Sequence, residues 1–214
     1  MTIRMTWPQG EQTEQLLQGA RDGDEGAAGQ LLNRHRDALH RMISLRLDRR
    51  IQQRVDASDI VQEVMIEANR RLNRYLEDPM MPFHLWLRQM AKDRIIDAHR
   101  RHRGSGKRSV DREQRMVVNA GLDRSTIELA AQLCDPEMTP AAAATMQELQ
   151  RRFRNALDTM EPNDREIVLM RHFEQLSNQD VASTLGLTEP AASMRYLRAI
   201  RKLQKLLSEP SDEA

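Results

Sequence analysis

Aromatic residues, cysteine, glycine and proline are all scarce in this 214-residue sequence. Aromatic residues make up only 3% of the chain, which argues against an all-β protein, because strands favour aromatic and β-branched residues. The 9 glycines and 8 prolines together stay below their average share of about 12%. The single cysteine, Cys134, cannot form an internal disulfide, so we expect a reducing, cytoplasmic location.

Long apolar runs and clusters of metal ligands are also missing from the sequence. No apolar run approaches the roughly 18 residues that span a bilayer, and the N-terminal 15 residues lack the apolar core of a signal peptide. His99 and His102 are three residues apart, but no third ligand has suitable spacing, and there is no glycine-rich phosphate loop. We therefore expect no membrane insertion, no metal site, no cofactor and no enzymatic activity.

Good helix formers dominate what is present: leucine, alanine, arginine, glutamate and glutamine. Apolar residues recur at helical spacing in two stretches, which are separated by a segment with little periodicity and several turn residues. The sequence predicts an all-α fold with two small helical domains, residues 11–102 and 141–207, joined by a long linker, residues 103–140. In the first domain we expect helices at 11–22, 24–47, 59–76 and 83–101.

Residues 177–207 have the layout of a helix-turn-helix, in which a short helix, a glycine turn and a longer helix follow one another. Ser177 and Asp180 have the spacing of a capping box at the start of the short helix. Gly186 suits the left-handed position that ends it. Thr188 can cap the longer helix, and Pro190 is tolerated in its first turn.

The longer helix has one apolar stripe and one basic arc when its residues are plotted at about 100° each. The apolar stripe consists of Ala192, Tyr196, Ala199, Ile200, Leu203, Leu206 and Leu207. The basic arc consists of Met194, Arg195, Arg198, Arg201, Lys202 and Lys205. A solvated face usually mixes charges of both signs, whereas an arc with five cations and no acid suits the DNA major groove. We therefore predict that this arc and the neighbouring Ala191 contact DNA, with Arg195 and Arg198 at base edges and Arg201, Lys202 and Lys205 at phosphates.

The predicted helix 59–76 carries an apolar stripe that begins at Val61, and its opposite face is polar except for one isoleucine. That opposite face includes Asp59, Gln62, Glu63 and Ile66. Two interpretations of this pattern stay open. The isoleucine is either an ordinary exposed side chain or the centre of a small protein-binding patch with acidic flanks.

The predicted helix 83–101 leads into a strongly basic stretch. Arg88, Lys92, His99 and Arg103 fall within about 60° of arc. The window from residue 88 to residue 108 holds eight Lys or Arg and two acids, a net charge of +6. Such a stripe suits a phosphate backbone, and the alternative is a solubilising basic face that leads into a linker.

These constellations, in this order, resemble the extracytoplasmic-function class of bacterial RNA polymerase sigma factors. Asp59-Ile-Val-Gln-Glu63 is similar to the D-[LI]-V-Q-E motif of the family's second conserved region. Residues 83–87 and 97–101 are similar to F-x-x-W-L…D-x-x-R-R in its promoter-melting helix, although the family often has Asn where this chain has Asp93. Residues 176–199 resemble the helix-turn-helix of the fourth region.

The resemblance implies a subunit that gives bacterial core RNA polymerase its promoter specificity and has no catalysis of its own. It implies that the face of Asp59, Gln62, Glu63 and Ile66 binds the β′ clamp helices. The basic helix is then expected to bind and melt the −10 element, and the C-terminal domain to read the −35 element and touch the β flap. An anti-sigma factor is a further expected partner.

A free-standing helix-turn-helix regulator is the alternative function. Residues 177–207 alone would permit it, because such a regulator binds DNA without polymerase. The Asp59–Glu63 motif and the second basic helix argue against it, because a simple regulator needs neither.

Overall fold

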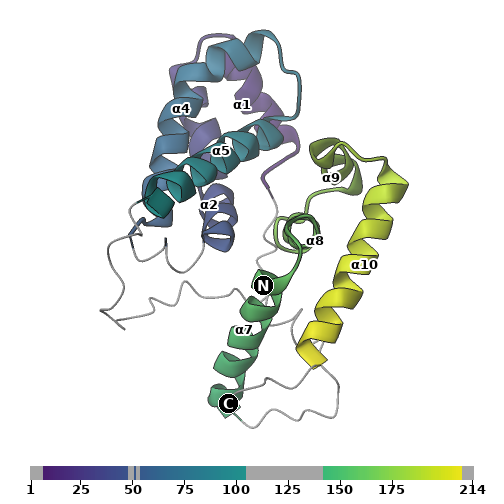
Figure 1. Ribbon diagram of the computed structural model, residues 1–214. Helices are drawn as coiled ribbons and strands as arrows, with labels where there is room; N and C mark the ends of the chain where they lie inside the picture. Colours follow the sequence, from purple (N-terminus) through teal and green to yellow (C-terminus); the bar gives the residue numbers. More distant parts are fainter. Residues whose placement is uncertain (1–6, 48–50, 52–53, 105–141, 209–214) are drawn as a thin grey trace. The chain divides into compact units, whose positions relative to one another are not determined.

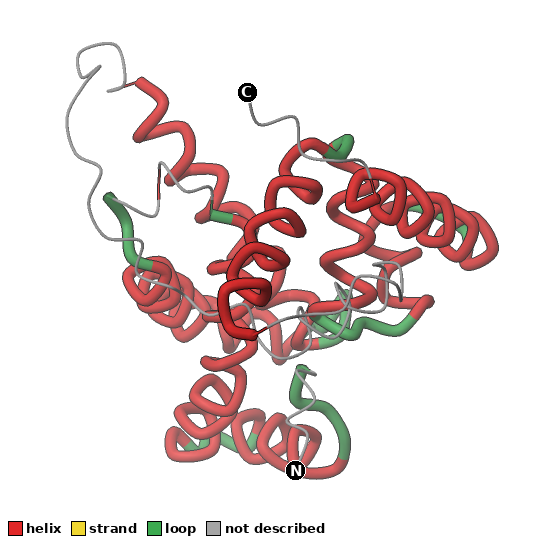
Figure 2. Tube along the Cα trace, turned by 90° about the horizontal axis from the view of Figure 1, so that it is seen from below, coloured by secondary structure: helices red, strands yellow, loops and turns green. Residues whose placement is uncertain are grey.

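The computed structural model describes residues 7–47, 51, 54–104 and 142–208. Contacts between residues divide the chain into two units, residues 1–116 and 117–214. All regular structure in the described residues is helical, as Figure 2 shows, which confirms the predicted all-α fold. Most of the predicted linker, together with Cys134, lies outside the described residues.

Four helices form the described part of the first unit (Figure 1): α1 (Glu11–Arg21), α2 (Glu25–Arg46), α4 (Ala57–Glu77) and α5 (Phe83–Gly104). Helix α2 packs against the other three, and α4 also packs against α5. Helix α4 begins two residues before the predicted start, because the Asp56 side chain caps it by accepting a 2.7 Å hydrogen bond from the Ser58 amide. Helix α5 continues three residues beyond its predicted end, to Gly104.

An aromatic cluster joins α4 to the start of α5. The Tyr75 and Trp86 rings stack with centroids 4.6 Å apart, and the Phe83 ring lies 5.5 Å from each of them. The Tyr75 hydroxyl also donates a 2.9 Å hydrogen bond to the carbonyl oxygen of Met81. This hydrogen bond holds the loop between α4 and α5 against the cluster.

A buried histidine connects α2 to the segment that precedes α1. His35 is 0% exposed, with Nδ1 2.9 Å from the Leu31 carbonyl oxygen and Nε2 3.1 Å from the Pro8 carbonyl oxygen. Burial lowers the pKa of His35, and the two carbonyl oxygens act in the opposite direction. Trp7, which is 4% exposed, covers the His35 ring at a centroid distance of 6.3 Å.

The second unit contains α7 (Ala142–Thr159), α8 (Pro162–Val168), the π-helix η2 (Leu169–Phe173), α9 (Asn178–Leu185) and α10 (Glu189–Ser208). Helix α10 packs against α7, α8 and α9. The core between them includes Phe153, Ile167, Met170, Val181 and Leu203, each 0% exposed. Apolar side chains of α8 and η2 therefore support both helices of the helix-turn-helix.

The predicted turn chemistry of the helix-turn-helix is present. The Ser177 hydroxyl accepts a 3.0 Å hydrogen bond from the Asp180 amide at the start of α9. Gly186 has a left-handed φ of 62° at its end. The Thr188 hydroxyl accepts a 3.3 Å hydrogen bond from the Ala191 amide at the start of α10. These local caps set the direction in which α10 leaves the turn.

Candidate functional site

Helix α10 buries one side and turns its predicted basic arc outward. Ala192, Ala199 and Leu203 on the apolar side are each 0% exposed. The outward side carries Arg195, which is half-buried, and five exposed residues of the predicted arc: Met194, Arg198, Arg201, Lys202 and Lys205. Ala191 is also exposed, in the first turn of the helix. The structure thus brings every predicted C-terminal site residue onto one helix surface.

Most of the charge on this arc has no ion-pair partner among the described residues. The Lys202 ammonium lies 3.5 Å from an Asp164 carboxylate oxygen on α8. Within the part of the chain that the structure describes, no ion pair involves the other four cations of the arc, Arg195, Arg198, Arg201 and Lys205. A ligand that approaches this surface therefore meets four cations without a competing carboxylate partner.

Arg171 of η2 connects the turn before α9 to α10. Its Nη1 donates a 2.7 Å hydrogen bond to the Leu176 carbonyl oxygen, and its guanidinium lies 5.7 Å from the centroid of the Tyr196 ring. Burial raises the pKa of the half-buried Tyr196. Tyr196 therefore contributes to packing on the inner side of α10 and not to its outward surface.

On α4, the structure places Asp59, Gln62 and Ile66 on the exposed surface. The Ile66 side chain is 48% exposed, a large value for an isoleucine in the middle of a helix. Gln62 and Ile66 line an open groove of about 590 Å³ between α2 and α4. The opposite wall includes Asn33 and Arg36 of α2.

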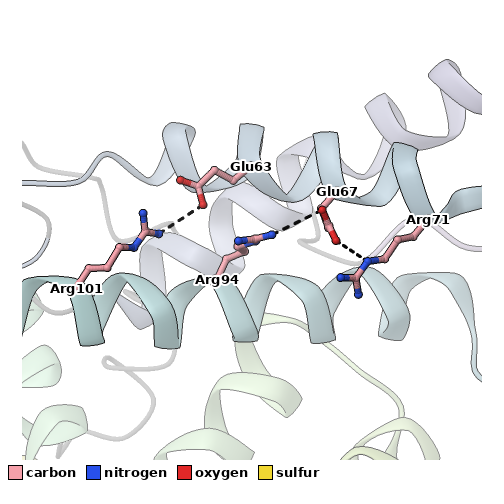
Figure 3. A network of polar contacts seen from close by, with 5 residues as sticks. All are labelled: Glu63, Glu67, Arg71, Arg94 and Arg101. Atoms are coloured by element: carbon pink, nitrogen blue, oxygen red, sulfur yellow. Dashed lines mark ion pairs between the residues drawn. The ribbon is translucent and has the colours of Figure 1, made fainter.

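Glu63, the remaining residue of the predicted patch, faces α5 (Figure 3). One of its carboxylate oxygens lies 3.6 Å from Nη2 of Arg101. One helical turn further along α4, Glu67 pairs with Arg94 of α5 at 3.7 Å and with Arg71 of its own helix at 2.5 Å. These ion pairs form a row along one side of α4, made by Glu63, Glu67, Arg71, Arg94 and Arg101.

On α5, the predicted exposed position of Arg88 is wrong. Arg88 is 1% exposed and lies in the buried stripe with Leu87 and Ala91, both 0% exposed. The physical reason is that α5 packs against both α2 and α4, so its buried stripe is wider than the pattern of apolar residues indicated. A buried arginine in this stripe belongs to the core of the unit.

The other predicted basic residues of α5 differ in exposure. Lys92 is exposed and His99 is half-buried, while the Arg103 side chain lies outside the described residues. Arg100, which the arc of Arg88 did not include, is exposed. Asp93 is exposed beside Lys92, so the outer side of α5 carries both signs of charge.

Residues 31–105 match the family model described as "Sigma-70 region 2", and residues 150–203 match the one described as "Sigma-70, region 4". The chain belongs to the sigma-70 family. The region 2 match includes α4 and α5, and the region 4 match includes α8, η2 and α9 and most of α10. The candidate site residues of α4 and α5 therefore lie inside the region 2 match, and those of α10 lie inside the region 4 match except for Lys205, which follows its end.

Relatives of this sigma-70 family member are similar to it over nearly their whole length. "RNA polymerase sigma factor CnrH" of Cupriavidus metallidurans is 26% identical, over 92% of this chain and 95% of the relative. "ECF RNA polymerase sigma factor SigD" of Mycobacterium tuberculosis is 25% identical, over 96% of this chain and 89% of the relative. These relatives place the chain in the extracytoplasmic-function class.

Two solved structures share the fold. CnrH in complex with the cytosolic domain of CnrY matches with a TM-score of 0.58 and 23% identity, over 92% of this chain and 97% of that one. The sigma factor RpoE in complex with the anti-sigma factor NepR from Bartonella quintana matches with a TM-score of 0.51 and 17% identity, over 80% of this chain and 91% of that one.

The described residues of this sigma-70 family member contain neither a candidate membrane span nor a candidate metal-binding cluster. None of the described helices is long and apolar enough to cross a membrane. No group of three or more His, Cys, Asp or Glu side chains in the same part of the chain could hold a metal ion.

Proposed function

We propose that this chain is a dissociable subunit that gives bacterial RNA polymerase its promoter specificity and catalyses no reaction itself. The observation that carries the proposal is the presence of two different interaction helices in one chain. Helix α4 presents an exposed apolar residue with polar neighbours, in the segment that matches region 2. Helix α10 presents an outward cationic arc, in the segment that matches region 4.

The polymerase contact is proposed for Asp59, Gln62, Glu63 and Ile66, against the β′ clamp helices. A half-exposed isoleucine beside a groove, with polar and acidic residues around it, has the composition of a small interface with an apolar centre and a polar rim. Ile66 is the only apolar member of this set, so it is the candidate for the energetic centre of the contact.

The −10 contact is proposed for the outer side of α5. Lys92 and Arg100 are exposed and can reach phosphates of the promoter backbone. His99 and Arg103 are assigned to the neighbourhood of this contact. Arg88 is not assigned to it, because a side chain that is 1% exposed cannot reach DNA without leaving the core. An acid beside Lys92, Asp93, repels phosphate, so the cations on either side of it carry the contact.

The −35 contact is proposed for the outward surface of α10. Residues near the start of a recognition helix lie closest to base edges in the major groove, so Ala191, Met194, Arg195 and Arg198 are assigned to base contacts. Arg201, Lys202 and Lys205 lie further along the helix and are assigned to phosphates.

The remaining parts of the proposal concern domains and partners. We assign residues 11–102 and 141–207 to the two domains and residues 103–140 to a linker that threads through the polymerase. The β flap is the proposed partner of the C-terminal domain. An anti-sigma factor is a further proposed partner, since the similar sigma factor RpoE forms a complex with the anti-sigma factor NepR.

A footprinting experiment separates this proposal from a free-standing regulator. The chain is tested on promoter DNA alone, with core polymerase, and with core polymerase carrying an unrelated sigma factor. Protection of the −35 and −10 elements that appears only when the chain and core polymerase are both present is the expected result. Protection by the chain alone, unchanged by core polymerase, would support the free-standing regulator instead.

A further inference from the structure

The outward surface of α10 holds two large apolar side chains that its own core does not use. Met194 is 56% exposed and Leu197 is 48% exposed. A single exposed apolar side chain is ordinary in a soluble protein. Met194, however, lies within the cationic arc, about 40° around the helix from Arg198. Leu197 lies about 100° from Arg198, outside the arc.

The surroundings of Met194 indicate an anionic partner. Arg195, Arg198 and Arg201 have no ion pair among the described residues, and no acid lies on the arc. A protein partner that buried Met194 in an apolar pocket would also have to neutralise these guanidinium groups. The DNA backbone already carries negatively charged phosphates that can neutralise them. Charge complementarity therefore favours a nucleic acid over an apolar protein surface.

The chemistry of the side chain restricts what Met194 can recognise on DNA. A thioether has no hydrogen to donate and is only a weak acceptor, so it gains nothing from phosphates or from polar base edges. Its favourable contacts are with apolar atoms, and it is unbranched and flexible enough to adapt to them. In the major groove, the apolar group that distinguishes one base from the others is the C5 methyl of thymine.

We propose that Met194 reads a thymine of the −35 element through its C5 methyl group. This inference rests on the proposed function, because it requires α10 to lie in the major groove of a promoter. It assigns recognition of thymine to a side chain that makes no hydrogen bond to a base. Arg198, on the same side of the helix, positions the contact by holding a neighbouring base.

The test uses the full chain bound to core polymerase. A promoter is first selected by this holoenzyme from a library randomised over the −35 element. Each thymine of the selected element, on either strand, is then replaced singly by deoxyuridine, which lacks only the C5 methyl group. One replacement is expected to weaken binding by about three- to fivefold, the worth of one buried methyl group.

Three variants of the chain assign that loss to a side chain. In Met194→Ala, binding to the thymine promoter should fall. The thymine-to-deoxyuridine replacement that weakens the native holoenzyme should then have no further effect on binding. Met194→Leu keeps an apolar side chain and should retain most of the difference in binding between the thymine and deoxyuridine promoters. Leu197→Ala is the matched control, equally apolar and similarly exposed, and should show the full difference. Because both positions are exposed, thermal unfolding of all three variants should match that of the native chain.

The outcomes separate this inference from the function on which it rests. A holoenzyme that selects no promoter from the library refutes the proposed function and the inference together. A holoenzyme that selects promoters, but shows the same deoxyuridine effect in Met194→Ala as in the native chain, refutes the role of Met194 alone. Loss of the effect in Leu197→Ala, or insensitivity of the native holoenzyme to every replacement, also refutes it.

Discussion

The substitution Ile66→Glu should weaken binding to core polymerase without changing the fold of the chain. Ile66 lies on the exposed side of α4, beside the groove between α2 and α4. Glutamate is a good helix former, and surface substitutions usually change the free energy of unfolding by less than about 0.5 kcal/mol. Loss of binding with unchanged helicity would therefore report on the interface.

The size of the effect follows from the exposure of the side chain. Burying an isoleucine completely is worth about 1.5–3 kcal/mol. Since 48% of Ile66 is still exposed in the free chain, roughly half of that value is available on binding. Glutamate removes this gain and adds an unpaired carboxylate to a surface that already carries Asp59 and Glu63. A total loss of about 2 kcal/mol corresponds to about a 30-fold rise in Kd.

The assay is a titration of labelled chain with core polymerase in the absence of DNA. Ile96→Glu is the matched control, because Ile96 is a 39% exposed isoleucine of the same unit, on α5 and outside the patch. It should bind core polymerase like the native chain. An Ile66→Glu variant with native affinity would refute the reasoning, and equal weakening by both substitutions would show that any added charge suffices.

Three further predictions concern DNA reading and stability. Arg198→Ala should change the binding preference at particular −35 positions by about 1–3 kcal/mol. Lys205→Ala should weaken binding to all −35 sequences alike and reduce the slope of log binding constant against log salt concentration by about one. In a −35 library assayed with both variants, the same preference profile for the two would contradict these roles. Gln175→Gly should raise the free energy of unfolding by up to about 1 kcal/mol, because Gln175 has a left-handed φ of 52°, which strains any residue but glycine. Thermal unfolding measures this change. A loss of stability would mean that contacts of the Gln175 side chain outweigh the backbone strain. Because burial lowers the pKa of His35, the unfolded state binds more protons as pH falls through about 6.5, so stability should fall there and level off below the folded-state pKa. The dependence of Tm on pH between 7.5 and 5 should be shallower in His35→Leu, and an unchanged dependence would exclude His35 as its source.

Features fixed by neighbouring residues could be predicted from the sequence. The caps at Ser177 and Thr188 and the left-handed Gly186 depend on hydrogen bonds and backbone angles within three residues. The apolar stripe of α10 follows from one helical period, and all four buried residues of the helix, Ala192, Ala199, Leu203 and Leu207, lie on it. These local rules account for the helix-turn-helix and for most helix boundaries.

Features fixed by packing between distant segments could not be predicted in the same way. Arg88 looks like part of a basic stripe until α2 and α4 are both placed against α5. The groove beside Ile66 depends on Asn33 and Arg36, which lie about thirty residues earlier in a helix with no motif of its own. A helical plot contains no information on how many neighbours a helix has, so it shows too narrow a buried stripe.

The ion pairs between α4 and α5 limit how much positive charge is available to a ligand near α5 (Figure 3). The window from residue 88 to residue 108 has a net charge of +6, but Arg94 and Arg101 already face glutamates of α4. To reach a phosphate, Arg101 must leave Glu63, so one ion pair replaces another and little electrostatic free energy is gained. Attraction to DNA at this surface therefore depends on the cations that the protein itself leaves without a carboxylate, and the formal charge of the segment overstates it.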